Sequence, residues 1–128
     1  MGDIAFTKER LDDISKWTAE QKVLIVGNHC TQDIHMKDIV NAYDSVYGLL
    51  KWKDFWLSHC PLHPNELRGK KNIHGHVHFQ SIPDSRYFNT SLENINYSPI
   101  NVEEIRKRLS ETAMQELTTM SQEMKLYN

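Results

Sequence analysis

The sequence lacks long apolar runs and has little cysteine, with Cys30 and Cys60 as its two thiols. The apolar runs at residues 23–26 and 55–57 are far shorter than the roughly 20 residues that a membrane span requires. Two cysteines cannot form the disulfide framework of a small secreted domain, so both are expected as thiols in a reducing compartment. Residues 1–5 also lack the basic and apolar regions of a signal peptide, which predicts a cytoplasmic protein.

An excess of positive charge is missing as well. The chain has 15 Lys and Arg residues against 17 Asp and Glu residues, a formal net charge of −2 at pH 7. This balance excludes a module that binds nucleic acid through bulk positive charge, so nucleic acid is expected only as a substrate. With 128 residues, of which 39% are apolar and 25% charged, the composition is typical of one globular domain.

Helical spacing of apolar residues marks two segments in the first third of the chain. The first helix is expected to start after Thr7, a capping residue, and to end near Gln21. Its apolar positions are Leu11, Ile14 and Trp17. A second helix is expected from Asp33, with one apolar side formed by Met36, Ile39, Val40 and Tyr43.

Five segments have the character of β-strands. Residues 22–26 form a largely apolar run closed by Gly27, which is typical of a strand buried on both faces. Residues 45–50 and 54–58 are close enough to pair as a hairpin around residues 51–53. Further strands are expected at residues 71–74 and 87–92. Because strands and helices alternate, the predicted fold class is α/β or α+β with a mixed sheet.

The last quarter of the chain predicts one long amphipathic helix. Asn101 can cap it, and Glu104 can return a hydrogen bond to the cap. Apolar residues then follow at helical spacing, namely Val102, Ile105, Leu109, Ala113, Leu117, Met120 and Met124. We therefore expect a domain at residues 1–109 and a helical extension at residues 110–128.

Side chains that can bind metals gather at the predicted strand ends. Seven histidines are present, and five of them lie between residues 59 and 78. The loops that follow strands, or in one case precede a helix, carry Asp3, Asn28, His29, His59, His76 and His78. Such loops converge on one edge of a sheet, and this mixture of oxygen and nitrogen donors suits Mn²⁺, Fe²⁺, Zn²⁺ or Ni²⁺. Taken alone, each of these residues is more often a polar surface residue.

Four short motifs occur in a defined order along the chain. They are Gly2-Asp3, Gly27-Asn28-His29, Ser58-His59 and Gly75-His76-Val77-His78. In this order they resemble the motifs of the calcineurin-like metallophosphoesterase family. The segments at residues 58–64 and 93–97 are similar to its small phage and bacterial members, and the resemblance covers residues 2–109.

The resemblance implies a fold and a two-metal centre. The family fold is a sandwich of two mixed sheets flanked by helices, with the metal ions at the strand ends. By this resemblance Asp3 would bridge the two metals. One site would be completed by Asn28, His59 and His76, and His78 would serve the other.

The resemblance also assigns a catalytic role to His29. It would lie beside the scissile phosphate, where it protonates the leaving oxygen or stabilises the transition state. The family usually has an acidic residue after Asn-His, which would orient this imidazole, whereas this chain has Cys30. Cys30 is expected as a small structural replacement, with a soft metal ligand or a redox switch as the alternatives.

A further departure from the family lies at the beginning of the chain. The family starts with a strand that ends in Asp-x-His, and this sequence starts at the second motif. The site served by His78 therefore keeps only Asp3 and His78, so we expect one well-formed metal site and one incomplete site. The missing strand is expected to leave a sheet edge and apolar surface, to be covered by a second copy, a partner chain or the C-terminal helix.

These observations leave three functional hypotheses open. The first is a metal-dependent phosphoesterase for a phosphomonoester or phosphodiester, impaired by the missing first motif and by Cys30. The second is a catalytically inactive, phosphoesterase-derived protein that binds or regulates a partner, such as a phage factor acting on a host protein in the host cytoplasm. The third is the downstream piece of a split enzyme, whose upstream chain supplies Asp-x-His.

Overall fold

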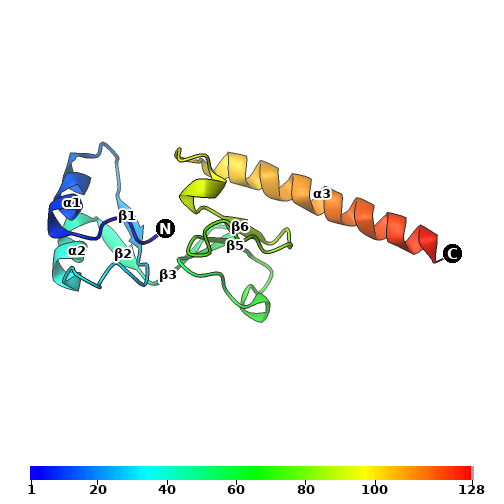
Figure 1. Ribbon diagram of the computed structural model, residues 1–128, viewed down its shortest axis with the longest axis horizontal. Helices are drawn as coiled ribbons and strands as arrows, with labels where there is room; N and C mark the ends of the chain where they lie inside the picture. Colours follow the sequence, from blue (N-terminus) through cyan, green and yellow to red (C-terminus); the bar gives the residue numbers. More distant parts are fainter. Residues whose placement is uncertain (128) are drawn as a thin grey trace.

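The computed structural model describes residues 1–127 and contains two units joined end to end, followed by a long helix (Figure 1). The N-terminal unit (residues 1–47) consists of α1 (Lys8–Asp12), η1 (Asp13–Lys16), β1 (Val23–Ile25), α2 (Met36–Ala42) and β2 (Ser45–Tyr47). The central unit (residues 49–109) consists of β3 (Leu49–Trp52), β4 (Phe55–Ser58), η2 (Pro64–Glu66), β5 (Lys71–His74), β6 (Tyr87–Asn89), η3 (Leu92–Asn94) and the start of α3 (Val102–Leu126). These elements confirm the predicted mixed helix and strand class and the long C-terminal helix.

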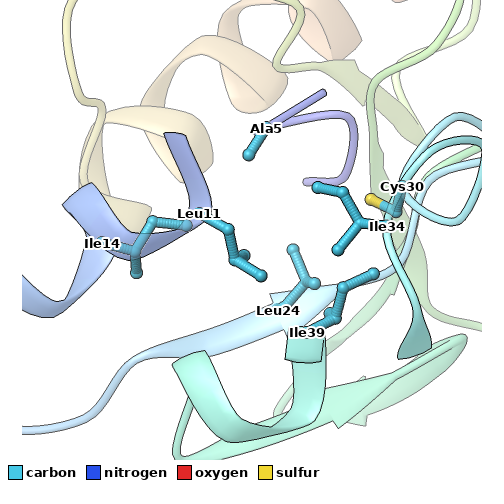
Figure 2. Packing of buried hydrophobic residues seen from close by; sticks show 7 residues of the cluster. All are labelled: Ala5, Leu11, Ile14, Leu24, Cys30, Ile34 and Ile39. Carbon is cyan, nitrogen blue, oxygen red and sulfur yellow. The ribbon is translucent and has the colours of Figure 1, made fainter. Parts of the chain in front are cut away.

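The N-terminal unit is a parallel β1-β2 pair covered by α1 and α2. Thr7 caps α1 as predicted, because its side chain accepts a hydrogen bond from the backbone of Arg10. The predicted end near Gln21 is wrong: the helix narrows to η1 and ends at Lys16, and the next residue, Trp17, is extended and exposed. The interior is entirely apolar, as Figure 2 shows for Ala5, Leu11, Ile14, Leu24, Cys30, Ile34 and Ile39.

The predicted strand at residues 45–50 is divided between the two units. Residues Ser45–Tyr47 pair with β1, and Leu49–Trp52 pair with β4, so that Gly48 separates β2 from β3. The hairpin with residues 55–58 is confirmed for β3 and β4. On β1, Leu24 and Ile25 are buried but Val23 is exposed, so the expectation of burial on both faces is wrong for its first residue.

The central unit is a mixed sheet with the strand order β3-β4-β5-β6. β3 and β4 are antiparallel, whereas β5 is parallel to both β4 and β6. β5 has the predicted bounds, but β6 ends at Asn89 because residues 92–94 form η3. One face is covered by the first turns of α3, and the apolar core consists of Phe55, Ile73, Ile105 and Leu109.

α3 begins as predicted and then leaves the body of the molecule (Figure 1). Asn101 accepts a hydrogen bond from the backbone of Glu104 at 2.9 Å, but the predicted reciprocal bond is replaced by a bond from Arg108 to the Glu104 carboxylate. Leu109 is the last buried residue of the helix. The predicted extension starts one residue later, and its final residue, 128, lies outside the described residues. Within residues 1–127, no helix is both long and apolar enough to span a bilayer.

Candidate functional site

Four of the predicted metal-binding residues lie together between the two units. The Nε2 atom of His59 is 3.1 Å from Oδ2 of Asp3 and 3.0 Å from Oδ1 of Asn28. The same atom is 3.2 Å from Nδ1 of His76, whose ring meets that of His59 edge to face. We call Asp3, Asn28, His59 and His76 the His59 cluster.

The topology explains why residues this far apart in the sequence meet. β4 and β5 are parallel neighbours, so the loops at their carboxyl ends, which carry His59 and His76, leave the same edge of the sheet. The backbone N–H of Gly75 donates to the carbonyl of His59 at 2.9 Å and ties these two loops together. Asn28 follows β1 of the other unit, and Asp3 precedes α1.

Two glycines allow the loops of Asp3 and Asn28 to approach closely. Gly2 has a φ of +82°, and a Cβ there would lie 2.5 Å from Nδ1 of His59. A Cβ on Gly27 would lie 2.1 Å from Oδ1 and 2.7 Å from the backbone nitrogen of Asp3. Any larger residue at either position would therefore push Asp3 away from His59.

Asp3 is also held by the loop that follows β1. Its Oδ1 accepts a hydrogen bond from the backbone N–H of His29 at 2.9 Å. Its own N–H donates to the sulfur of Cys30 at 3.2 Å, and the N–H of Gly27 donates to the same sulfur at 3.2 Å. Cys30 is thus a buried structural residue that joins the two loops, in agreement with the expectation from the sequence.

The hydrogen bonds of His59 define the charge that the cluster needs. Its Nδ1 lies 2.7 Å from the carbonyl oxygen of Met1, which can only accept, so Nδ1 donates and carries a proton. In a neutral ring, Nε2 would then present a lone pair to the carboxylate of Asp3 and to the amide oxygen of Asn28. A positive charge between these atoms removes the repulsion, and it is either a second ring proton or a metal ion.

The spacing of the donor atoms suits a metal ion. Two donors bound to one ion at about 2.1 Å lie about 3.0 Å apart at a right angle and about 3.4 Å apart at the tetrahedral angle. The three contacts of Nε2 of His59 fall in this range. Within residues 1–127, no group of three or more His, Cys, Asp or Glu side chains has the arrangement of a metal site. The fit therefore depends on the amide oxygen of Asn28 as one ligand.

No family model, curated protein or solved structure matches this chain. The function is therefore argued from the His59 cluster and from the residues around it.

His29 and His78 lie outside the His59 cluster but line the same cavity. The cavity has a volume of about 1070 Å³, and its other walls are largely apolar, with Trp52, Leu57 and Ile105 among them. Both histidines are exposed. A polar end beside a wide apolar trough can receive a ligand that combines an anionic group with a larger apolar part.

Each of these two histidines has a partner that the sequence did not reveal. Nδ1 of His29 lies 3.0 Å from Oε1 of Gln32, so Gln32, and not the residue after Asn-His, orients this ring. The i,i+3 spacing in a turn was the available signal. Nδ1 of His78 lies 2.9 Å from Oε1 of Glu93, and this hydrogen bond lowers the pKa of Glu93 below its ordinary value. Glu93 is 15 residues away along the chain, and nothing in the local pattern indicates the contact.

Asn72 is a third residue that sequence analysis missed. Its side chain is fully buried within β5, where it accepts a hydrogen bond from the N–H of Leu62 at 2.8 Å. It donates to the carbonyl of Trp56 and to the hydroxyl of Ser58. Asn72 thereby supports the loop that starts with His59. A polar residue in the middle of an otherwise buried strand was the available signal.

Proposed function

We propose that the chain is a metal-dependent phosphoesterase of the calcineurin-like metallophosphoesterase type, acting on a phosphomonoester or a phosphodiester. The observation that carries this proposal is the contact of Asp3, Asn28 and His76 with one nitrogen of His59. These residues belong to the four motifs that resemble the family. Loops from both units contribute to the cluster, so that its geometry depends on the whole fold.

In this proposal the His59 cluster holds one divalent ion of the Mn²⁺, Fe²⁺, Zn²⁺ or Ni²⁺ class. Such an ion lowers the pKa of a bound water and offsets the negative charge of a phosphate group. The Nδ1–H of His59 donates to the carbonyl of Met1, which is the support that metal-binding imidazoles usually have. The backbone N–H of His29 holds the second oxygen of Asp3, so that the other oxygen is directed at His59.

His29 is the proposed proton donor to the leaving oxygen. Its exposed ring lines the cavity, and its Nδ1 contacts Gln32, which leaves Nε2 free of that contact. The second metal site keeps only Asp3 and His78 from the family pattern. Because two ligands are too few for tight binding, we expect activity well below that of an enzyme with two bound ions.

The direct experiment is elemental analysis of the protein after dialysis, with Mn²⁺-dependent assays on an aryl phosphate and an aryl phosphodiester. We expect about one tightly held divalent ion per chain. His59→Ala should lose the ion, and His29→Ala should keep the ion and lose the hydrolysis. His35→Ala is the matched control, because His35 is exposed and its side chain makes no capping bond.

Two results would contradict the proposal. The first is an ion content that does not change in His59→Ala, because the cluster would then not be the metal site. The second is strong Mn²⁺-dependent turnover that survives His29→Ala. Two ions per chain would contradict the predicted single site, unless a second chain is shown to donate ligands.

The outer part of α3 favours a second candidate function, the binding or regulation of a partner protein. Four apolar residues on this part of the helix are about 60% or more exposed, namely Met114, Leu117, Met120 and Met124. Methionines adapt to irregular partner surfaces, so a homodimer or a hetero-complex is proposed for this face. An upstream chain that supplies Asp-x-His, as in a split enzyme, is the variant of this proposal that would restore the second metal site.

Light scattering at micromolar concentration tests this second candidate. A mass above the 15.0 kDa of one chain is expected, and removal of residues 110–128 should reduce it to that of a monomer. A monomer whose mass and stability do not depend on residues 110–128 would contradict the self-association. Added upstream chain that raises the ion content to two would favour the split enzyme.

A further inference from the structure

His78 is exposed, yet three side chains of the central unit hold it in place. The side-chain amide of Asn94 donates to its backbone carbonyl at 2.6 Å, and that of Asn89 donates to the same carbonyl at 2.8 Å. The backbone of His78 is left-handed, with a φ of +49°. An exposed residue in an unfavourable backbone conformation normally relaxes unless its surroundings prevent it, and such conformations gather at functional sites.

The third side chain acts on the imidazole ring itself. Oε1 of Glu93 lies 2.9 Å from Nδ1 of His78, and the side chain of Glu93 is only 17% exposed, against 75% for His78. Glu93 belongs to η3, which the chain forms directly after β6, so its position is set by the sheet. An ionised carboxylate can only accept hydrogen bonds. The contact therefore places a proton on Nδ1 and leaves Nε2 of a neutral ring with a free lone pair.

We propose that Glu93 is a positioning residue that presents Nε2 of His78 to the cavity as a ligand for a divalent cation. The inference rests on the proposed function for the presence of such a cation, but the orientation of the ring is a property of this chain alone. A carboxylate that accepts the second N–H of an imidazole fixes its tautomer and makes the other nitrogen a better ligand. Asn89 and Asn94 hold the backbone from which the ring extends.

Imidazole tautomers measured by long-range ¹H–¹⁵N correlation at pH 8 test the orientation without any metal. We expect the Nδ1–H form for His78 in the wild type. Glu93→Ala should favour the Nε2–H form, whereas Glu93→Gln should keep the Nδ1–H form, because the amide oxygen still accepts. Glu66→Gln is the control, since Glu66 is exposed and pairs with Arg68 on η2. An unchanged tautomer in Glu93→Ala, with circular dichroism confirming the fold, would overturn the proposal.

Titration with Zn²⁺ tests the ligand role. The Nε2 signal of His78 should shift on addition of Zn²⁺, and Glu93→Ala should weaken the apparent affinity at His78 about tenfold or more. Zn²⁺ that leaves His78 unchanged while it shifts His59 would overturn this role and leave the proposed function standing. If His59 does not respond but His78 still does, and with the tautomer described above, the proposed function fails and the role of Glu93 stands.

Discussion

The two units of the molecule are stabilised by different kinds of interior. The buried side chains of the N-terminal unit are apolar. The central unit has fewer buried apolar residues in its core cluster and adds four buried polar ones, namely Ser58, His59, Asn72 and His74. Apolar contacts depend little on direction, whereas hydrogen bonds require defined positions. The central unit therefore determines how His59 and His76 are oriented, and the N-terminal unit brings Asp3 and Asn28 to them.

The largest effect is expected from removing the central hydrogen-bond network. Asn72→Ala leaves the N–H of Leu62 and the carbonyl of Trp56 without their partner in a buried place. We expect a loss of about 3 kcal/mol in the free energy of unfolding, measured by urea denaturation. Asn65→Ala, at an exposed position of η2, is the control and should change stability by less than about 0.5 kcal/mol. Equal effects of both substitutions would remove the proposed difference between the two interiors.

A smaller effect is expected where the two units meet. Gly27→Ala places a Cβ against the backbone and carboxylate of Asp3, so the two loops must separate. We expect a loss of about 2 kcal/mol and, if the proposed metal site is correct, weaker Mn²⁺ binding by calorimetry. Gly48→Ala is the matched control, because a Cβ at that position meets no atom within 4 Å. Wild-type stability in Gly27→Ala would show that the loops do not depend on this close approach.

The smallest effect concerns the apolar interior of the N-terminal unit at high pH. Burial, with a smaller contribution from Cys30, raises the pKa of Tyr43 to about 12. The folded state thus disfavours the ionised phenol, and stability should fall as the pH rises from about 10 to about 12. Tyr43→Phe should reduce this fall by less than about 1 kcal/mol, since Tyr43 is partly exposed and solvent screens the charge. Urea midpoints at pH 9 and pH 11 measure the difference.

A control in the same unit makes this last prediction specific. Tyr47→Phe removes an exposed hydroxyl from β2 and should leave the fall in stability as large as in the wild type. If both substitutions reduce the fall equally, burial of Tyr43 is not its cause. If neither does, the alkaline loss of stability comes from other groups, and the interior of the N-terminal unit does not contribute to it.

Local sequence patterns predicted the segments whose structure depends on nearby residues. The strand at residues 71–74 and the Asn101 cap of α3 were correct, because strand character and capping depend on a few adjacent positions. The end of the first helix was wrong, because Trp17 has helical spacing but no partner to bury it. The division of residues 45–52 at Gly48 was also missed, since it depends on which strand each half meets.

The residues of the candidate site were predicted to different extents. The sequence order of the motifs led to Asp3, Asn28, His59 and His76, and these side chains do meet. The residues that support the site did not follow from any pattern. Gln32, Asn72 and Glu93 act through contacts that the fold creates, and their residue types are common in loops and strands that have no such role.

The sequence by itself determined which segments form helices and strands and which side chains can serve as ligands, because these depend on residue type and short spacing. Only the tertiary structure decided that the loops after β1, β4 and β5 meet at Asp3, since parallel pairing and two close glycine contacts join residues up to 73 positions apart. It also decided that Glu93 faces His78 and that the outer half of α3 stays exposed. Periodicity can indicate an apolar face, but burial requires a second surface to pack against it.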